Sequence, residues 1–129
     1  MFKKIDHIEI LPGNLERSLK FYTEILGFKV AWRFEPENAP MNEIVFIELG
    51  GTQIELFALK KPPAPPAGEE QRRAGLRRIG LLVEDMDKAI EYLKAKGVEI
   101  SGSPRATREN LKIAEIKDPD GLAIELIER

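Results

Sequence analysis

The sequence has no cysteine and only one histidine among its 129 residues. The absence of cysteine excludes disulfides, thiolate metal sites and a cysteine nucleophile, and it fits the reducing cytoplasm, where we expect the protein. The single histidine, His7, limits any imidazole chemistry to one position. No apolar run approaches the roughly 18 residues of a membrane-spanning helix. We therefore expect no membrane partner.

An excess of charge of one sign is also lacking. Lysine and arginine total 20 against 22 aspartates and glutamates, which gives a net charge of -2. Binding to a phosphate backbone requires a basic face, so we expect no nucleic-acid partner. The chain is 43% apolar and 33% charged, as in ordinary globular proteins, and it is long enough to bury a core.

The two halves of the sequence repeat each other. When His7 is aligned with Arg78, a short apolar strand pattern begins each half and a helical pattern follows it. Both helices are predicted to begin at a residue with a capping side chain and to end at a glycine. These residues are Asn14 and Gly27 in the first half, and Asp85 and Gly97 in the second.

Three further strands are predicted in each half. The last strands, Thr52–Phe57 and Leu122–Ile127, match in sequence and follow turn signals. The remaining strand candidates are Phe28–Phe34 and Ile44–Leu49 in the first half and Leu111–Lys117 in the second. The counterpart of Phe28–Phe34 in the second half is expected near Val98–Ser101. Each half therefore follows a βαβββ pattern, and the fold class is α+β.

A proline-rich segment joins the two halves. Four prolines at positions 62, 63, 65 and 66 favour extended geometry and exclude regular secondary structure. We interpret residues 60–75 as a stiff connector between modules at about 1–59 and 76–129. Neither module alone is large enough for a robust core, so a single pseudo-symmetric domain over residues 1–129 is expected.

Strand alternation separates an aliphatic face from a polar face in each half. In the first strand, Ile8 and Ile10 form the aliphatic face, and His7 and Glu9 lie on the other. Because the helices cover the aliphatic faces, the opposite faces are left to a shared small-molecule cleft. Those faces present four polar residues at equivalent positions of the two halves: His7, Glu55, Arg78 and Glu125.

This arrangement resembles the vicinal oxygen chelate superfamily, also called the glyoxalase and bleomycin-resistance fold. The resemblance covers nearly the whole chain and is carried by residues 6–8, 21–28, 54–56, 79–85, 118–121 and 124–126. It implies paired βαβββ modules whose curved mixed sheets surround a cleft, and it implies a homodimer. In glyoxalase-I-like members four strands each provide one ligand of a divalent metal, and the matching positions here are His7, Glu55, Arg78 and Glu125.

Arg78 departs from this pattern, which has histidine at that position. Arginine stays protonated and offers only donors, so it cannot ligate a cation. One interpretation is a three-ligand site of His7, Glu55 and Glu125 for Ni, Co, Mn, Fe or Zn. The metal would serve a lyase or isomerase acting on a small oxygen-rich or thioester-type substrate. Glu55 or Glu125 would act as the general base, and Arg78 would anchor an anionic group.

Two alternatives stay open. In a metal-free sequestration or resistance-type protein, the guanidinium of Arg78 would replace the cation and bridge Glu55 and Glu125. In the second alternative, His7 is an ordinary hydrogen-bonded strand residue, and the glutamates lie at solvated strand ends.

Aromatic residues accompany the polar positions. Trp32, Phe34, Phe46 and Phe57 fit either a core or an apolar pocket. Of these, Phe46 and Phe57 are predicted to contact the substrate.

Overall fold

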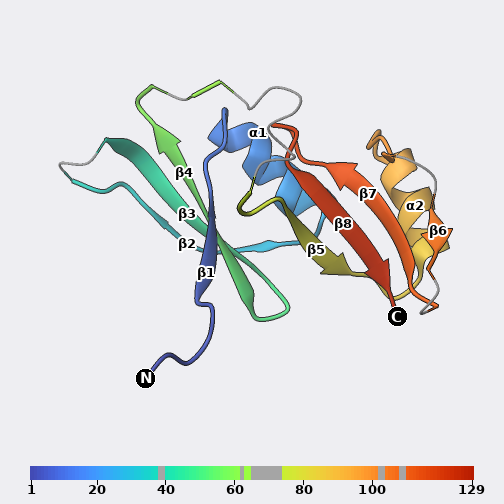
Figure 1. Ribbon diagram of the computed structural model, residues 1–129. Coiled ribbons are helices and arrows are strands. Elements are labelled where there is room, and N and C mark those ends of the chain that lie inside the picture. The colour runs from blue at the N-terminus through green and yellow to red at the C-terminus, as the bar shows by residue number, and fades with distance from the viewer. Residues whose placement is uncertain (38–39, 62, 65–73, 102–103, 108–109) are drawn as a thin grey trace. The chain divides into compact units, whose positions relative to one another are not determined.

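The protein was analysed as a computed structural model that describes residues 1–37, 40–61, 63–64, 74–101, 104–107 and 110–129. It divides into two compact units, Met1–Pro65 and Pro66–Arg129. Each unit contains one four-stranded mixed sheet (Figure 1). No helix in the described ranges is long and apolar enough to cross a membrane.

The first unit begins with strand β1 (His7–Ile10) and helix α1 (Leu15–Lys20), which continues as the π-helical turn η1 (Phe21–Ile25). Strands β2 (Lys29–Phe34), β3 (Met41–Leu49) and β4 (Thr52–Leu59) follow. The sheet order is β1-β4-β3-β2, with β1 parallel to β4 and the other pairs antiparallel. The first half therefore has the predicted βαβββ pattern.

The second unit repeats the first, element by element. It consists of β5 (Arg78–Leu82), α2 (Met86–Ala95), β6 (Arg105–Ala106), β7 (Lys112–Lys117) and β8 (Ala123–Glu128). Its sheet order is β5-β8-β7-β6, again with one parallel pair, β5 and β8. The predicted α+β class with two βαβββ modules is confirmed. The single domain over residues 1–129 stays a prediction, and the connector falls mostly outside the described residues, at positions 62 and 65–73.

One predicted strand is wrong. Residues Val98–Ser101 form no strand, and the counterpart of β2 is the two-residue β6 further along the chain. The backbone at Val98 is instead used to end α2, because its N–H donates to the carbonyl of Leu93 at 2.9 Å. A backbone group engaged in closing a helix is not available to a sheet ladder.

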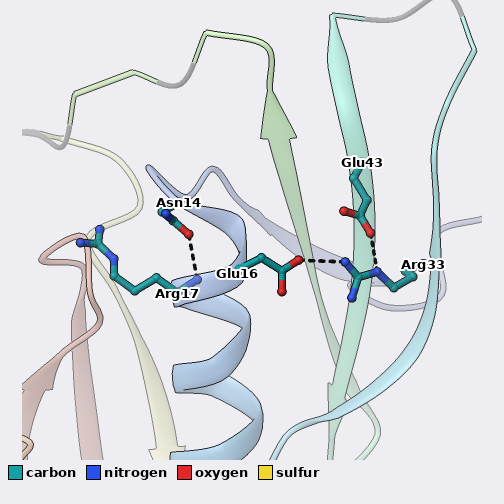
Figure 2. Close-up of polar contacts among 5 residues, drawn as sticks. All are labelled: Asn14, Glu16, Arg17, Arg33 and Glu43. Carbon is teal, nitrogen blue, oxygen red and sulfur yellow. Dashed lines mark hydrogen bonds and ion pairs between the residues drawn. The ribbon is translucent and has the colours of Figure 1, made fainter.

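The predicted helix boundaries are confirmed. The side chain of Asn14 accepts a hydrogen bond from the backbone N–H of Arg17 at 2.9 Å, as Figure 2 shows. The Asp85 carboxylate accepts from the N–H of Lys88 at 3.0 Å. Both helices are followed by a glycine with positive φ, 84° at Gly27 and 78° at Gly97. Side-chain caps and left-handed glycines together fix both ends of each helix segment.

The core of each unit lies between the helix and the aliphatic face of its own sheet. The fully buried side chains include Tyr22, Ile47 and Leu56 in the first unit, and Met86, Ile116 and Ile124 in the second. Because strand residues alternate, burial of the aliphatic face turns the polar positions to the opposite side. The strand-face assignment made from the sequence is therefore confirmed within each unit.

An ion-pair network fastens α1 to the sheet of the first unit. Arg33 of β2 contacts the Glu16 carboxylate of α1 at 3.0 Å and also pairs with Glu43 of β3 (Figure 2). These contacts raise the pKa of Arg33, with Glu43 as the larger cause. The helix and two strands are thus joined on the face away from His7.

Acid should weaken the N-terminal cap of α2 but not that of α1. The hydrogen bond from the Lys88 N–H lowers the pKa of Asp85 below its ordinary value of 3.8, whereas Asn14 does not titrate. The stabilising contribution of Asp85 is therefore complete above pH of about 4 and is lost as pH falls through its lowered pKa. Asp85→Asn keeps the cap but removes this dependence. The unfolding temperatures of the parent and of Asp85→Asn, measured between pH 7 and 2, should differ in their pH dependence only at the acid end. Parallel curves would contradict this assignment.

Candidate functional site

His7 occupies the first position of β1, and both of its ring nitrogens face carboxylates. Nδ1 lies 2.9 Å from Oδ2 of Asp6, and Nε2 lies 3.1 Å from Oε2 of Glu55. The side chain of His7 is 33% exposed and that of Glu55 is 13% exposed. Asp6 fixes the orientation of the ring, which leaves Nε2 directed at Glu55. The structure thus brings together two of the residues predicted for the site.

Neighbouring acidic groups change the protonation of His7. The hydrogen bond to Asp6 raises the pKa of the imidazole above its ordinary value of 6.5, and the charges of Glu55, Asp6 and Glu9 act in the same direction. The same hydrogen bond lowers the pKa of Asp6. His7 is therefore more basic than an isolated histidine, which also makes its neutral form a stronger electron-pair donor.

Glu9 is a third donor that was not assigned to the site from the sequence. It pairs with Glu55 in the register of β1 and β4, so the two side chains lie on the same face. Ligand atoms of His7, Glu9 and Glu55 all lie within 4.8 Å of one another. The signal was present in the sequence, because Glu9 follows His7 by two positions on one strand face.

An aromatic layer supports His7 on this face of the sheet. The Phe46 ring packs edge-on against the His7 ring, with centroids 5.1 Å apart. Trp32 stacks on Phe46 at 4.3 Å and on Phe34 at 5.0 Å. Phe46 and Phe57 are buried in one cluster with Ile44, whereas Trp32 is 47% exposed. The assignment of Phe46 and Phe57 to substrate binding stays a prediction, and Trp32 presents more open aromatic surface.

The equivalent face of the second unit is organised around Arg78. Its Nη1 atom donates to Oε2 of Glu115 and to Oε2 of Glu125, each at 3.0 Å. All three side chains are about 30% exposed. Glu115 was missed in the sequence analysis, although it lies directly opposite Glu125 in the register of β7 and β8. Arg78 therefore offsets part of the negative charge of two adjacent carboxylates.

The four predicted positions fall into two pairs, His7 with Glu55 and Arg78 with Glu125. Each pair joins the first strand of its unit to the last. The bridge expected from Arg78 to Glu55 would join the two units and stays a prediction, as does the cleft. Within its own unit, Arg78 bridges Glu125 to Glu115 instead.

A hollow of about 340 Å³ lies elsewhere in the first unit, at the beginning of α1. Its lining includes Asn14, Glu16, Asn42 and Glu43, and none of the predicted site residues. Arg33 already pairs with both of its carboxylates. The hollow is therefore a charge-balanced groove at the edge of the helix, separate from the His7 cluster.

The donor set around His7 fits a divalent metal. Imidazole and carboxylate ligands suit Zn, Fe, Co, Ni and Mn. Ligand distances of about 2.0–2.2 Å to a common ion put two ligands no more than about 4.4 Å apart. A small side-chain rotation brings atoms within 4.8 Å of each other into that range. Asp6, on the far ring nitrogen, occupies the place of the carboxylate that commonly supports a metal-binding histidine.

The contact with Asp6 can be tested directly because the chain has one histidine. Asp6→Asn should shift the pKa of His7 downwards, since the amide removes the largest cause of its elevation. Glu55→Gln should lower the pKa less, since the charge of Glu55 is a smaller cause. An NMR titration of the His7 ring in metal-free protein measures both shifts. Glu91→Gln, which removes a charge from α2, serves as the control. An unchanged pKa in Asp6→Asn would refute the role assigned to that carboxylate.

Comparisons with known proteins identify the family of the chain. The model of the Glyoxalase/Bleomycin resistance protein/Dioxygenase superfamily matches residues 4–126. The uncharacterized protein YwkD of Bacillus subtilis (strain 168) is 32% identical over 129 residues, which are 100% of this chain and 99% of that protein. A probable chloroplastic lactoylglutathione lyase of Arabidopsis thaliana is 31% identical over 129 residues, which are 98% of this chain but 36% of the relative. This chain thus spans about a third of that relative's length.

A solved structure gives the same assignment. The crystal structure of a glyoxalase family protein from Enterococcus faecalis superposes with a TM-score of 0.84 and 31% identity, and the match covers 98% of both chains. The family match, the two βαβββ units and the His7 pair with Glu55 agree. The chain therefore belongs to the Glyoxalase/Bleomycin resistance protein/Dioxygenase superfamily.

Proposed function

We propose that this glyoxalase-like protein is a divalent-metal-dependent lyase or isomerase acting on a small oxygen-rich or thioester-type substrate. The observation that carries the proposal is the arrangement of His7. Its Nε2 atom faces Glu55 at 3.1 Å, while Asp6 holds the other ring nitrogen. A relative named as a probable lactoylglutathione lyase supports this reaction class.

His7 and Glu55 are the proposed metal ligands of the first unit, and Glu125 is the proposed ligand of the second. When bound, the metal supplies a Lewis acid that polarises neighbouring substrate oxygens. A polarised carbonyl acidifies the adjacent carbon, so a carboxylate is sufficient as the general base. Glu55 or Glu125 accepts that proton and returns it to the neighbouring carbon. Glu55 suits this role because it is largely shielded from water.

Arg78 is the proposed anchor for an anionic group of the substrate. Arg78 donates two hydrogen bonds from Nη1, to Glu115 and Glu125, so its guanidinium keeps further donors for a ligand. Its charge is already shared by Glu115 and Glu125, which favours a ligand with one carboxylate over a highly charged one. Phe46 and Phe57 are the proposed apolar contacts. We further propose that the protein is a homodimer located in the cytoplasm.

A second candidate function is metal-free binding of a small molecule, of the sequestration or resistance type. The position of Arg78 favours it, because a fixed guanidinium already supplies a positive charge to Glu115 and Glu125. In this case the protein would hold its ligand by charge and shape without changing it. Metal content separates the two candidates.

Metal analysis of protein purified without chelators tests the proposal. We expect near-stoichiometric divalent metal in the parent and its loss in Glu125→Gln, because the amide is a poor ligand for the ion. Arg78→His should bind at least as tightly, since imidazole adds a ligand. The metal-loaded parent should then convert hemithioacetals or acyl thioesters, measured by absorbance or by proton exchange with solvent.

The opposite pattern would favour the second candidate. If the parent contains no metal and Arg78→His acquires it, arginine has displaced the cation. Ligand binding without turnover in that parent would then establish a sequestering protein.

A further inference from the structure

We propose that Glu9 is an additional metal ligand, which supplies the donor that Arg78 cannot. The inference rests on the proposed function, because it concerns the same metal. It changes the expected ligand set, in which each of four strands contributes one residue. Here β1 contributes two ligands, His7 and Glu9, to the same ion.

The backbone places Glu9 beside the other donors. Glu9 and Glu55 are direct partners in the parallel pairing of β1 and β4. His7 lies two positions earlier on β1, so all three side chains leave the sheet on one face. Their ligand atoms lie within 4.8 Å of one another. The Glu9 side chain is exposed, so it can rotate towards a common ion without disturbing the core.

Charge provides a second argument. Two adjacent carboxylates repel each other unless a cation lies between them. Among the described residues, no lysine or arginine forms an ion pair with Glu9 or Glu55, and Glu55 pairs with His7. The first unit therefore holds two carboxylates with only a titratable imidazole beside them.

The second unit also holds two adjacent carboxylates, on a different pair of strands, and there a cation is built in. Its two adjacent carboxylates, Glu115 and Glu125, share the guanidinium of Arg78. The position equivalent to Glu9 is Gly80, which pairs with Glu125 as Glu9 pairs with Glu55. A side chain at Gly80 would meet open space, so packing does not explain the glycine. The unit with a fixed cation has no third donor, and the unit without one has Glu9.

The test compares near-isosteric variants of the full chain after chelator treatment. Mn²⁺ and Ni²⁺ are titrated into the parent, Glu9→Gln, His7→Gln and the control Glu91→Gln, and calorimetry measures affinity and stoichiometry. Glu9→Gln should bind at least about 10- to 100-fold more weakly, since even supporting residues of metal sites contribute that much. Glu91→Gln removes the same charge from an exposed position of α2 and should bind like the parent.

The coordination geometry of the bound metal can be measured independently of the metal affinity. Co²⁺ bound to the parent and to Glu9→Gln should differ in visible absorption, because the loss of a protein ligand changes the coordination sphere. Circular dichroism and thermal unfolding confirm that each variant is folded. Glu9→Asp provides a second variant, which should retain part of the affinity because it keeps a carboxylate.

The outcomes separate the inference from the proposed function. If His7→Gln loses the metal while Glu9→Gln binds as tightly as the parent with an unchanged Co²⁺ spectrum, Glu9 is not a ligand and the proposed function stands. If the parent binds neither Mn²⁺ nor Ni²⁺, the proposed function fails and the assignment of Glu9 fails with it.

Discussion

Adjacent carboxylates on a sheet face require a positive charge, and this constraint organises the polar faces of both units. Glu9 and Glu55 are register partners in one sheet, and Glu115 and Glu125 are register partners in the other. Two such charges a few ångström apart repel each other, and the repulsion grows as the groups are shielded from water. The second unit meets the requirement with Arg78, whose Nη1 contacts both carboxylates. The first unit has His7, whose charge depends on pH and whose neutral form can ligate a metal. The two halves therefore share a backbone pattern but differ in the source of the cation.

The buried aliphatic face of each sheet holds these polar groups in place on the opposite face. Burial of aliphatic side chains against α1 or α2 fixes which strand face is turned away from the helix. A shift of one residue in the register of β1 would bury His7 and expose Ile8, so the polar face is determined by the core. Phe46, on which Trp32 stacks, then restricts the ring of His7 from one side, and Asp6 restricts it at Nδ1. The orientation of the imidazole is thus set by packing and one hydrogen bond before any ligand is bound.

Much of this arrangement was predictable from the sequence, because it depends on period and repetition. The capping residues Asn14 and Asp85, the βαβββ order and the placement of His7, Glu55, Arg78 and Glu125 on the faces opposite the aliphatic ones follow from alternation and from the alignment of the halves. The parts that were missed depend on register across strands. Glu115 faces Glu125 only because β7 and β8 pair as they do, and the register of β1 and β4 adds Glu55 as the partner of Glu9, which the sequence had already placed on the face of His7. The short β6 was misplaced because the end of α2 uses the backbone at Val98, which hydrophobic pattern does not reveal.

The substitution of a metal-ligand position by arginine does not by itself remove metal chemistry from such a scaffold. Arginine cannot act as a metal ligand, but a donor elsewhere on the same face can replace the missing ligand. That donor must lie on a rigid strand and leave the sheet in the same direction. Glu9 meets both conditions, since it belongs to β1 and shares a face with His7 and Glu55. Arg78 gains a different capacity, because a guanidinium recognises carboxylates through directed donors that an imidazole bound to metal does not offer. The two halves of the repeated fold thus differ in what they offer: the first groups His7, Glu9 and Glu55 as donors for a cation, and the second presents the guanidinium of Arg78 beside Glu115 and Glu125.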